Sequence, residues 1–195
     1  MRFTEVMSLT LRDPEFVRKR MRIQGEFSAL LAERVLKDAA VDAAVFVEPI
    51  AENRGPLISP KMYEDFVLKS YEPVLAVLRR HRVHTIILLT FANFRPLLPS
   101  IVKSGFNCLW ACEVPQKDMD YRELRHEFGR DLRLIGGIVL DALRLDKESI
   151  KREVYEKVPR LLADGGFVPL GDGRVRKDIP LGNYLYYRRL FEEVT

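Results

Sequence analysis

Fold class follows from three consecutive segments of this chain: LRLIGGI at residues 132–138, KESIKREVYEKVPRLLA at 147–163 and FVPL at 167–170. The outer two are short and mostly apolar, as buried strands are. The middle one repeats its apolar residues at helical spacing, with Asp146 as its N-cap and the pair Gly165-Gly166 beyond its end. A strand, a helix and a second strand in this order are typical of a parallel crossover unit.

The same alternation of apolar runs and helical periods extends along the whole chain. No linker, low-complexity stretch or repeat interrupts it, so residues 1–195 are predicted to form one domain. Five buried strands separated by helices indicate an α/β protein with a parallel sheet. Strands are predicted at 43–48, 85–89, 108–112, 132–138 and 167–170. Helices are predicted at 13–35, 59–78 with a kink at Pro73, 95–103, 121–128, 147–163 and 181–194.

Two α/β architectures fit this pattern, an open doubly wound sheet and a (β/α)₈ barrel. The open fold usually carries a G-x-G-x-x-G turn after its first strand, and the sequence has no such motif. The pattern therefore favours five βα units of a (β/α)₈ barrel.

Composition and charge narrow the class of protein. The chain is 47% hydrophobic, and its 32 basic and 28 acidic residues are intermixed rather than clustered, which argues against a nucleic-acid partner. No apolar run reaches the roughly 18 residues of a membrane span, and the N-terminal residues contain Glu5, unlike a signal peptide. Two cysteines are too few for a secreted disulfide framework, so we expect a cytoplasmic protein without a membrane partner.

Polar residues follow each predicted strand, where active sites of (β/α)₈ barrels are built. These residues are Glu48, Asn93, Arg95, Glu113, Asp141, Asp172, Arg174, Arg176 and Lys177. Glu48, Glu113 and Asp172 could act as general acids or bases if burial shifts their pKa values toward neutrality. Alternatively, they cap the next helix or pair with a nearby arginine.

Glycines and cysteines give weaker signals. The sequence Gly171-Asp172-Gly173-Arg174 could hold an anion or form a solvated turn, and Gly136-Gly137 could clear space for a ligand or end a strand. Cys108 and Cys112 have no second ligand pair nearby, so buried thiols are favoured over a metal site.

Four segments in a fixed order carry a family resemblance: GPLISP at 55–60, RPLLP at 95–99, LIGGI at 134–138 and DIPLGNY at 178–184. Together they resemble the uroporphyrinogen decarboxylase superfamily. The resemblance implies a (β/α)₈ barrel that removes carboxyl groups from the acetate arms of a tetrapyrrole without a cofactor. In related members it implies zinc-dependent methyl transfer between corrinoid proteins and thiols.

The chain departs from the family at several functional positions. Leu89 and Phe91 occupy the positions that resemble the zinc ligands of the methyltransferases, so no metal and no cofactor are predicted. Asp172 stands where the decarboxylases have a histidine, and a carboxylate would repel an acetate arm. Pro49 stands where they have a serine.

Two functional hypotheses follow, and both concern a small anionic substrate. In the first, the chain is a decarboxylase-like enzyme in which Asp172, Glu48 and Glu113 handle protons. The residues expected to bind a tetrapyrrole-like anion are Asn93, Arg95, Gly136, Gly137, Gly171, Gly173, Arg174 and Arg176. In the second, the chain is a non-catalytic binding or interaction member of the family; a corrinoid methyltransferase relative that has lost its zinc site is a third possibility.

The resemblance also concerns partners. Family members are nearly twice as long, and their first three strands would precede Met1. A five-stranded arc leaves two unpaired edges, which natural proteins cover. We therefore expect a homo-oligomer or an association with a chain that supplies the missing strands, unless the chain is a truncated product.

Overall fold

The computed structural model describes residues 3–114 and 118–195, and it groups them into two compact units. The first unit contains the described residues up to 44 together with 58–86 and 97–105. The second contains 45–57, 87–96 and the described residues from 106 to 195. Each unit is described separately below.

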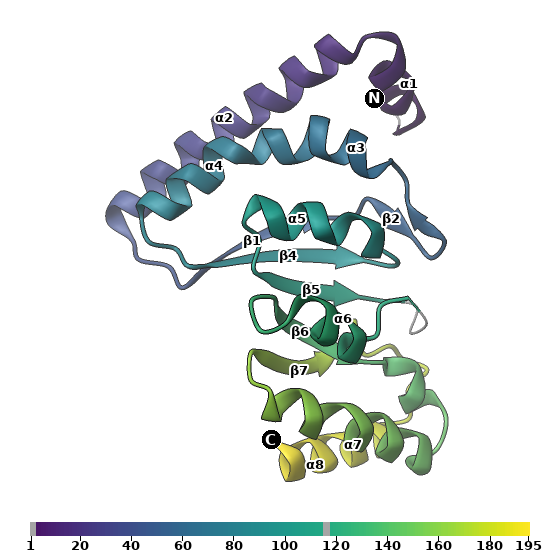
Figure 1. The fold of residues 1–195 in the computed structure, drawn as a ribbon. Coiled ribbons are helices and arrows are strands. Elements are labelled where there is room, and N and C mark those ends of the chain that lie inside the picture. Colours follow the sequence, from purple (N-terminus) through teal and green to yellow (C-terminus); the bar gives the residue numbers. More distant parts are fainter. Residues whose placement is uncertain (1–2, 115–117) are drawn as a thin grey trace. The chain divides into compact units, whose positions relative to one another are not determined.

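The first unit is helical. It contains α1 (Phe3–Arg12), α2 (Pro14–Asp38), α3 (Pro60–Met62), a π-helical turn η1 (Tyr63–Leu68), α4 (Lys69–Arg80) and α5 (Leu98–Ser104). Helix α2 lies beside α4 (Figure 1). The two helices approach closely at Gly25, where an added Cβ would lie 1.9 Å from the carbonyl oxygen of Ser70. Arg80 of α4 and Glu33 of α2 join them by an ion pair of 2.7 Å.

The helix starts follow the predicted caps, but two features differ from the prediction. Asp13 caps α2 as expected, because its side chain accepts a hydrogen bond from the Phe16 N–H at 3.1 Å. Helix α1 ends immediately before this cap and was not predicted. The helix predicted at 59–78 ends at Arg80, and its irregular part is η1. Pro73 lies inside α4, where it lacks the N–H that would bond four residues back.

The second unit is built on a five-stranded parallel sheet in the order β1-β4-β5-β6-β7 (Figure 1). The strands are β1 (Ala43–Glu48), β4 (Thr85–Phe91), β5 (Cys108–Cys112), β6 (Arg133–Ile138) and β7 (Phe167–Gly171). All five predicted strands are confirmed, with shifts of one or two residues at their ends. A short antiparallel hairpin of β2 (Ala51–Glu52) and β3 (Gly55–Pro56) was not predicted, because two-residue strands carry no periodicity.

Three helices and two 3₁₀ turns complete the described elements: α6 (Tyr121–Phe128), α7 (Lys147–Ala163), α8 (Leu181–Val194), η2 (Arg95–Leu97) and η3 (Leu140–Arg144). Helices α7 and α8 pack side by side, with η3 beside both (Figure 1). Their shared core consists of Ile138, Leu140, Leu143, Ile150, Val154, Val158, Ile179, Tyr187 and Leu190. Tyr184 and Tyr186 pack against it, so the C-terminal tyrosines serve helix packing.

One face of the sheet is apolar and exposed at its edges. The parallel register aligns Leu89, Trp110, Ile135 and Val168 in one row, whose side chains therefore share a face. We call this row, together with Leu170, the open face. Val168 and Leu170 of β7 are exposed, and β1 shows the same alternation at Val45 and Val47. Parallel sheets are normally covered on both faces. The exposure of Val168 and Leu170 shows that the open face is uncovered at β7 within the described chain.

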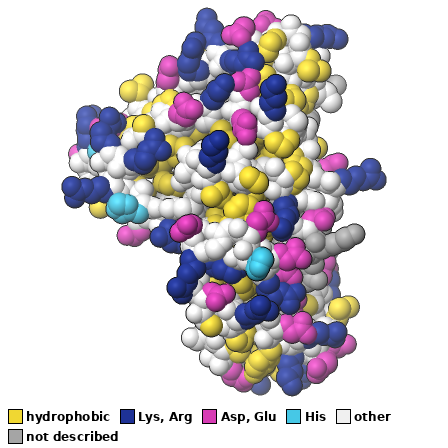
Figure 2. Space-filling view, viewed as in Figure 1, with side chains coloured by type: hydrophobic (Ala, Val, Ile, Leu, Met, Phe, Trp, Pro, Cys, Tyr) yellow, Lys and Arg dark blue, Asp and Glu magenta, His cyan; other side chains and the backbone are white. Residues whose placement is uncertain are grey.

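The surface carries mixed charge. On the face seen in Figure 2, basic and acidic side chains lie among one another, as the sequence predicted. Within residues 3–114 and 118–195, no helix combines the length and the apolar character needed to cross a membrane.

Replacing Gly25 by alanine should destabilise the first unit. The new Cβ would meet the backbone of Ser70 at 1.9 Å, and α2 must move away from α4 to admit it. Such overpacking costs about 1–3 kcal/mol. Gly182→Ala is the matched control, because this helical glycine has no neighbouring atom within 4 Å of the added Cβ. Urea denaturation of both variants measures the difference, and equal stabilities would contradict the close approach.

Candidate functional site

The carboxyl ends of β5, β6 and β7 border a cavity of about 410 Å³, which we call the Asp172 cavity. Because these strands are parallel, the segments that follow them reach the same edge of the sheet. Asn53 of the β2–β3 turn also contributes to its wall. The charged side chains that line it are Glu113, Asp141, Arg144, Asp172, Arg174 and Arg176.

Asp172 is the buried acidic group of this cavity, with 6% of its surface exposed. Its Oδ1 accepts a hydrogen bond from the Leu140 N–H at 3.0 Å, and its own N–H donates to the Ile138 carbonyl at 2.8 Å. Burial raises the pKa of Asp172 against the opposing Leu140 hydrogen bond, and the Asp141 and Glu153 carboxylates raise it further. Asp172 therefore keeps its proton to a higher pH than an ordinary aspartate does.

Glu113 follows β5 in the left-handed backbone region, with φ of 49°. Its N–H donates to the Asp172 carbonyl at 2.5 Å, and its carboxylate forms an ion pair of 2.6 Å with Arg176. Such a backbone conformation is unfavourable for a residue with a side chain and is held here by these two contacts. Glu113 and Arg176 therefore neutralise one another at the mouth of the cavity.

Arg174 and Arg144 differ in what they bind. Arg144 forms ion pairs with Asp141 and, at 2.7 Å, with Asp178. Arg174 is exposed and lines the cavity, and it makes no hydrogen bond or ion pair with the described part of the chain. A bound anion could therefore engage Arg174 without first breaking an internal ion pair.

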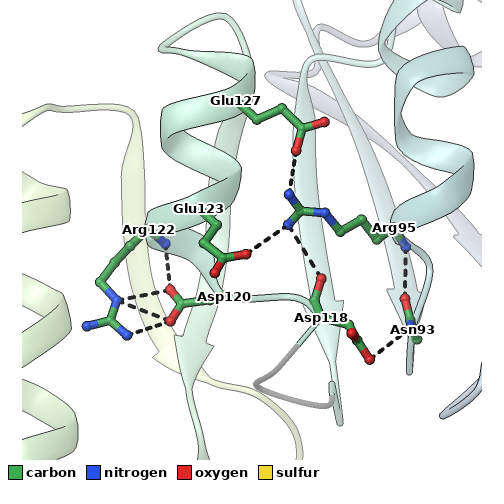
Figure 3. A network of polar contacts seen from close by, with 7 residues as sticks. All are labelled: Asn93, Arg95, Asp118, Asp120, Arg122, Glu123 and Glu127. Atoms are coloured by element: carbon green, nitrogen blue, oxygen red, sulfur yellow. Dashed lines mark hydrogen bonds and ion pairs between the residues drawn. The ribbon is translucent and has the colours of Figure 1, made fainter.

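Asn93 and Arg95 belong to a different network, which Figure 3 shows. Arg95 forms ion pairs with Glu127 at 2.5 Å and Glu123 at 3.6 Å, both on α6. Asn93 donates from Nδ2 to Asp118 at 3.1 Å and accepts from the Arg95 N–H at 3.3 Å. Arg95 holds the loop after β4 against α6, Asn93 holds it against Asp118 before that helix, and neither lines the Asp172 cavity.

The predicted site residues thus divide into two groups. The structure brings together Asp172, Glu113, Gly173, Arg174 and Arg176 around one cavity. Glu48 is the last residue of β1, where its backbone carbonyl accepts a hydrogen bond from Thr90 Oγ1 at 3.2 Å, and it does not line that cavity. The roles predicted for Glu48, Asn93 and Arg95 therefore have no geometric link to Asp172 in the described residues.

Gly136 and Gly137 make room for a tyrosine. A Cβ on Gly137 would lie 2.8 Å from the Tyr121 ring, and one on Gly136 would lie 3.2 Å from its hydroxyl oxygen. That hydroxyl accepts from the Ala111 N–H at 3.0 Å and donates to the Ile135 carbonyl at 2.7 Å, which joins β5 to β6. The prediction was that the glycine pair clears space for a ligand or ends a strand. The space beside the pair is filled by Tyr121, and β6 ends one residue later, at Ile138.

Packing also leaves no room for a side chain at Gly171, since a Cβ there would lie 2.8 Å from Leu140 Cδ2. The two cysteines are buried and unbonded. Burial raises the pKa of Cys108 to about 11 and also raises that of Cys112, which disfavours the thiolate that a metal requires. Within the described ranges, no cluster of three or more histidine, cysteine or acidic side chains could hold a metal ion.

Sequence reasoning missed a buried ion pair beside the cavity, Glu153 and Lys157 of α7. Charged residues one turn apart on a helix are usually solvated. Their position in the sequence could have indicated this burial. Glu153 and Lys157 directly precede Val154 and Val158, which lie on the apolar stripe of the same helix.

Comparison with known proteins identifies the family. A family model described as uroporphyrinogen decarboxylase (URO-D) matches residues 1–168. A search of curated proteins gave no match. The family match covers most of the chain, including four of the five strands and the two residues that begin β7.

The raised pKa of Asp172 predicts a pH-dependent stability. The folded state binds this proton more tightly than the unfolded chain, whose aspartate pKa is about 3.9. The stabilising contribution of Asp172 is therefore present below pH 4 and is lost as pH rises through the folded pKa. Asp172→Asn keeps an oxygen for the Leu140 N–H but carries no charge, so it should gain stability relative to wild type with rising pH. The gain is about 1.4 kcal/mol for each unit by which the pKa is raised.

Chemical denaturation at a series of pH values between 4 and 8 measures this difference. Asp131→Asn removes an exposed carboxylate and is the matched control. A constant difference between Asp172→Asn and wild type across this range would contradict the assignment.

Proposed function

The chain belongs to the uroporphyrinogen decarboxylase family, and we propose that it binds a carboxylate-bearing, tetrapyrrole-like anion in the Asp172 cavity and removes carbon dioxide from it. One observation carries the proposal. Asp172 is a buried carboxyl with a raised pKa, and it shares the cavity wall with the guanidinium of Arg174, which forms no ion pair with the described residues. A proton donor and an anion contact are thereby offered to one ligand.

The net reaction consumes a single proton. A proton from water first adds to the pyrrole ring, which makes the ring electron-poor. The bond between the carboxylate carbon and its methylene group then breaks, carbon dioxide leaves, and the electron pair of that bond is delocalised into the protonated ring. The proton of Asp172 adds to the methylene carbon and gives a methyl group, the ring returns its proton to water, and Asp172 regains a proton from water. In this proposal no metal or cofactor takes part.

The sequence predicted that an Asp172 carboxylate would repel an acetate arm of the substrate, and protonation of Asp172 would remove this repulsion. An ionised Asp172 would oppose a carboxylate ligand, whereas a protonated one can donate a hydrogen bond to it. Arg174 would bind the carboxylate by a charge-assisted hydrogen bond. Glu113 and Arg176 would remain paired and contribute little net charge.

We also propose that further strands close the sheet into a (β/α)₈ barrel and that another polypeptide supplies them. The apolar open face and the two edge strands β1 and β7 support this proposal. Strands that pair with both edges would cover the open face and satisfy both rows of backbone groups at once. Two copies that merely stack their open faces would leave all edges unpaired, so a partner that supplies strands is favoured over a dimer of this stacked kind. We place this assembly in the cytoplasm, where the free thiols Cys108 and Cys112 would stay reduced.

Substitutions in the cavity should separate binding from chemistry. With uroporphyrinogen as the ligand, Arg174→Ala should weaken binding about 10- to 100-fold, because a hydrogen bond to a charged group contributes about 1.5–3 kcal/mol. Asp172→Asn should retain binding and lose carbon dioxide release. Arg189→Ala removes an exposed arginine of α8 and is the matched control.

Two measurements check these outcomes: calorimetric titration of the ligand and detection of released carbon dioxide. Binding without release in the wild type would contradict decarboxylation and support the non-catalytic alternative. Absence of binding would contradict both.

The open face should determine association. A polypeptide containing the first three strand–helix units of a longer family member should form a one-to-one complex with this chain, measured by light scattering. The sole tryptophan, Trp110, lies on the open face, so its fluorescence should shift to shorter wavelength on covering. Val168→Lys should prevent both changes, whereas Leu145→Lys, an exposed position outside the sheet, should not. A mass equal to a multiple of this chain alone would instead indicate a homo-oligomer.

A further inference from the structure

A buried ion pair lies beside the Asp172 cavity. Glu153 and Lys157 are one turn apart on α7, and 9% and 8% of their surfaces are exposed. Lys157 Nζ donates a hydrogen bond to Glu153 Oε1. Two charged groups have thus been removed from water inside the second unit.

The pair is bonded to the backbone at the end of β6. Glu153 Oε1 accepts from the Val139 N–H at 2.8 Å, and Lys157 Nζ donates to the Gly137 carbonyl at 3.4 Å. The next N–H along the chain, that of Leu140, donates to Asp172 Oδ1. The segment 137–140 therefore connects the ion pair on one side to the Asp172 carboxyl on the other.

Stability alone does not account for such a pair. Removing two ions from water costs several kcal/mol each, and apolar replacements of buried pairs are often neutral or stabilising. Because the ion pair is hydrogen-bonded to the backbone at Val139 and Gly137, it can hold that backbone in position.

We infer that Glu153 and Lys157 are positioning residues for Asp172: they fix the backbone that presents the Leu140 N–H to its carboxyl, and their two charges balance each other at that carboxyl. This inference rests on the proposed function, in which Asp172 handles the proton. In this inference, Glu153 and Lys157 of α7 set the proton affinity of Asp172.

The electrostatic effects of the two residues on Asp172 are opposite. Glu153 raises the pKa of Asp172, and Lys157 lowers it. Among the described residues, the other titratable or charged groups near Asp172 are Asp141 and Arg144 of η3, Glu113 and Cys112 at the end of β5, Tyr121 of α6, and Arg174 and Arg176 of its own loop. None of these is altered by substitutions on α7.

A double-mutant cycle tests the inference, with the pKa of Asp172 measured by carbon-detected NMR titration and no substrate present. Glu153→Gln should lower this pKa, and Lys157→Met should raise it. The double variant should return it toward the wild-type value, and it guards against loss of folding because neither charge is left unpaired. Glu156→Gln removes an exposed carboxylate from the same helix and should leave the pKa unchanged.

Hydrogen exchange of the Leu140 amide provides a second readout, which should accelerate in both single variants. Shifts of the Asp172 pKa in the same direction, or no shift in either folded variant, would overturn the inference. Because no substrate is used, failure here is distinguishable from failure of the proposed decarboxylation. A responsive Asp172 without carbon dioxide release would refute only the latter.

Discussion

The hydroxyl of Tyr121 is the contact on which the geometry of the site depends. It binds both the Ala111 N–H of β5 and the Ile135 carbonyl of β6, and so takes the place of a direct bond between the strands. The ring occupies the space that side chains at positions 136 and 137 would need, which explains two consecutive glycines with φ of 113° and 85°. Strand β6 ends one residue later and turns its next N–H groups toward Glu153 and Asp172.

Among the described residues, the charged side chains of the cavity form ion pairs, apart from Asp172 and Arg174. Glu113 is matched by Arg176, and Arg144 by Asp141 and Asp178, so these groups give shape without a strong net field. Burial raises the pKa of Asp172 and so disfavours an unpaired buried charge at this position, as expected for a carboxyl removed from water. Arg174 is exposed whereas Asp172 is buried. This arrangement suits a ligand that enters with its anionic group toward Arg174.

Much of the fold could be predicted from the sequence because its elements are local. The strand at residues 43–48 and the helices at 121–128, 147–163 and 181–194 have the predicted ends, since apolar periodicity and capping residues determine them. The site was predicted only where strand ends force convergence, as at Asp172 and Glu113. Asn93 and Arg95 also follow a strand, but the Arg95 guanidinium binds carboxylates of α6 and does not line the cavity. Residue spacing along the chain does not predict this ion pairing. The packing of Tyr121 on two glycines and the burial of Glu153 with Lys157 are tertiary contacts as well, invisible to spacing alone.

Closure of the sheet would change the two sides of the cavity differently. Asp172 is already buried by its own unit, so its raised pKa depends on the ends of β6 and β7 and on α7 rather than on any partner. Arg174 and the Glu113–Arg176 pair are exposed, and their interactions are screened by water. A partner that covers the open face and extends past the strand ends would lower the dielectric around these groups and strengthen their attraction for an anion. The proton affinity of the site is therefore a property of this chain, whereas its affinity for substrate should increase on assembly.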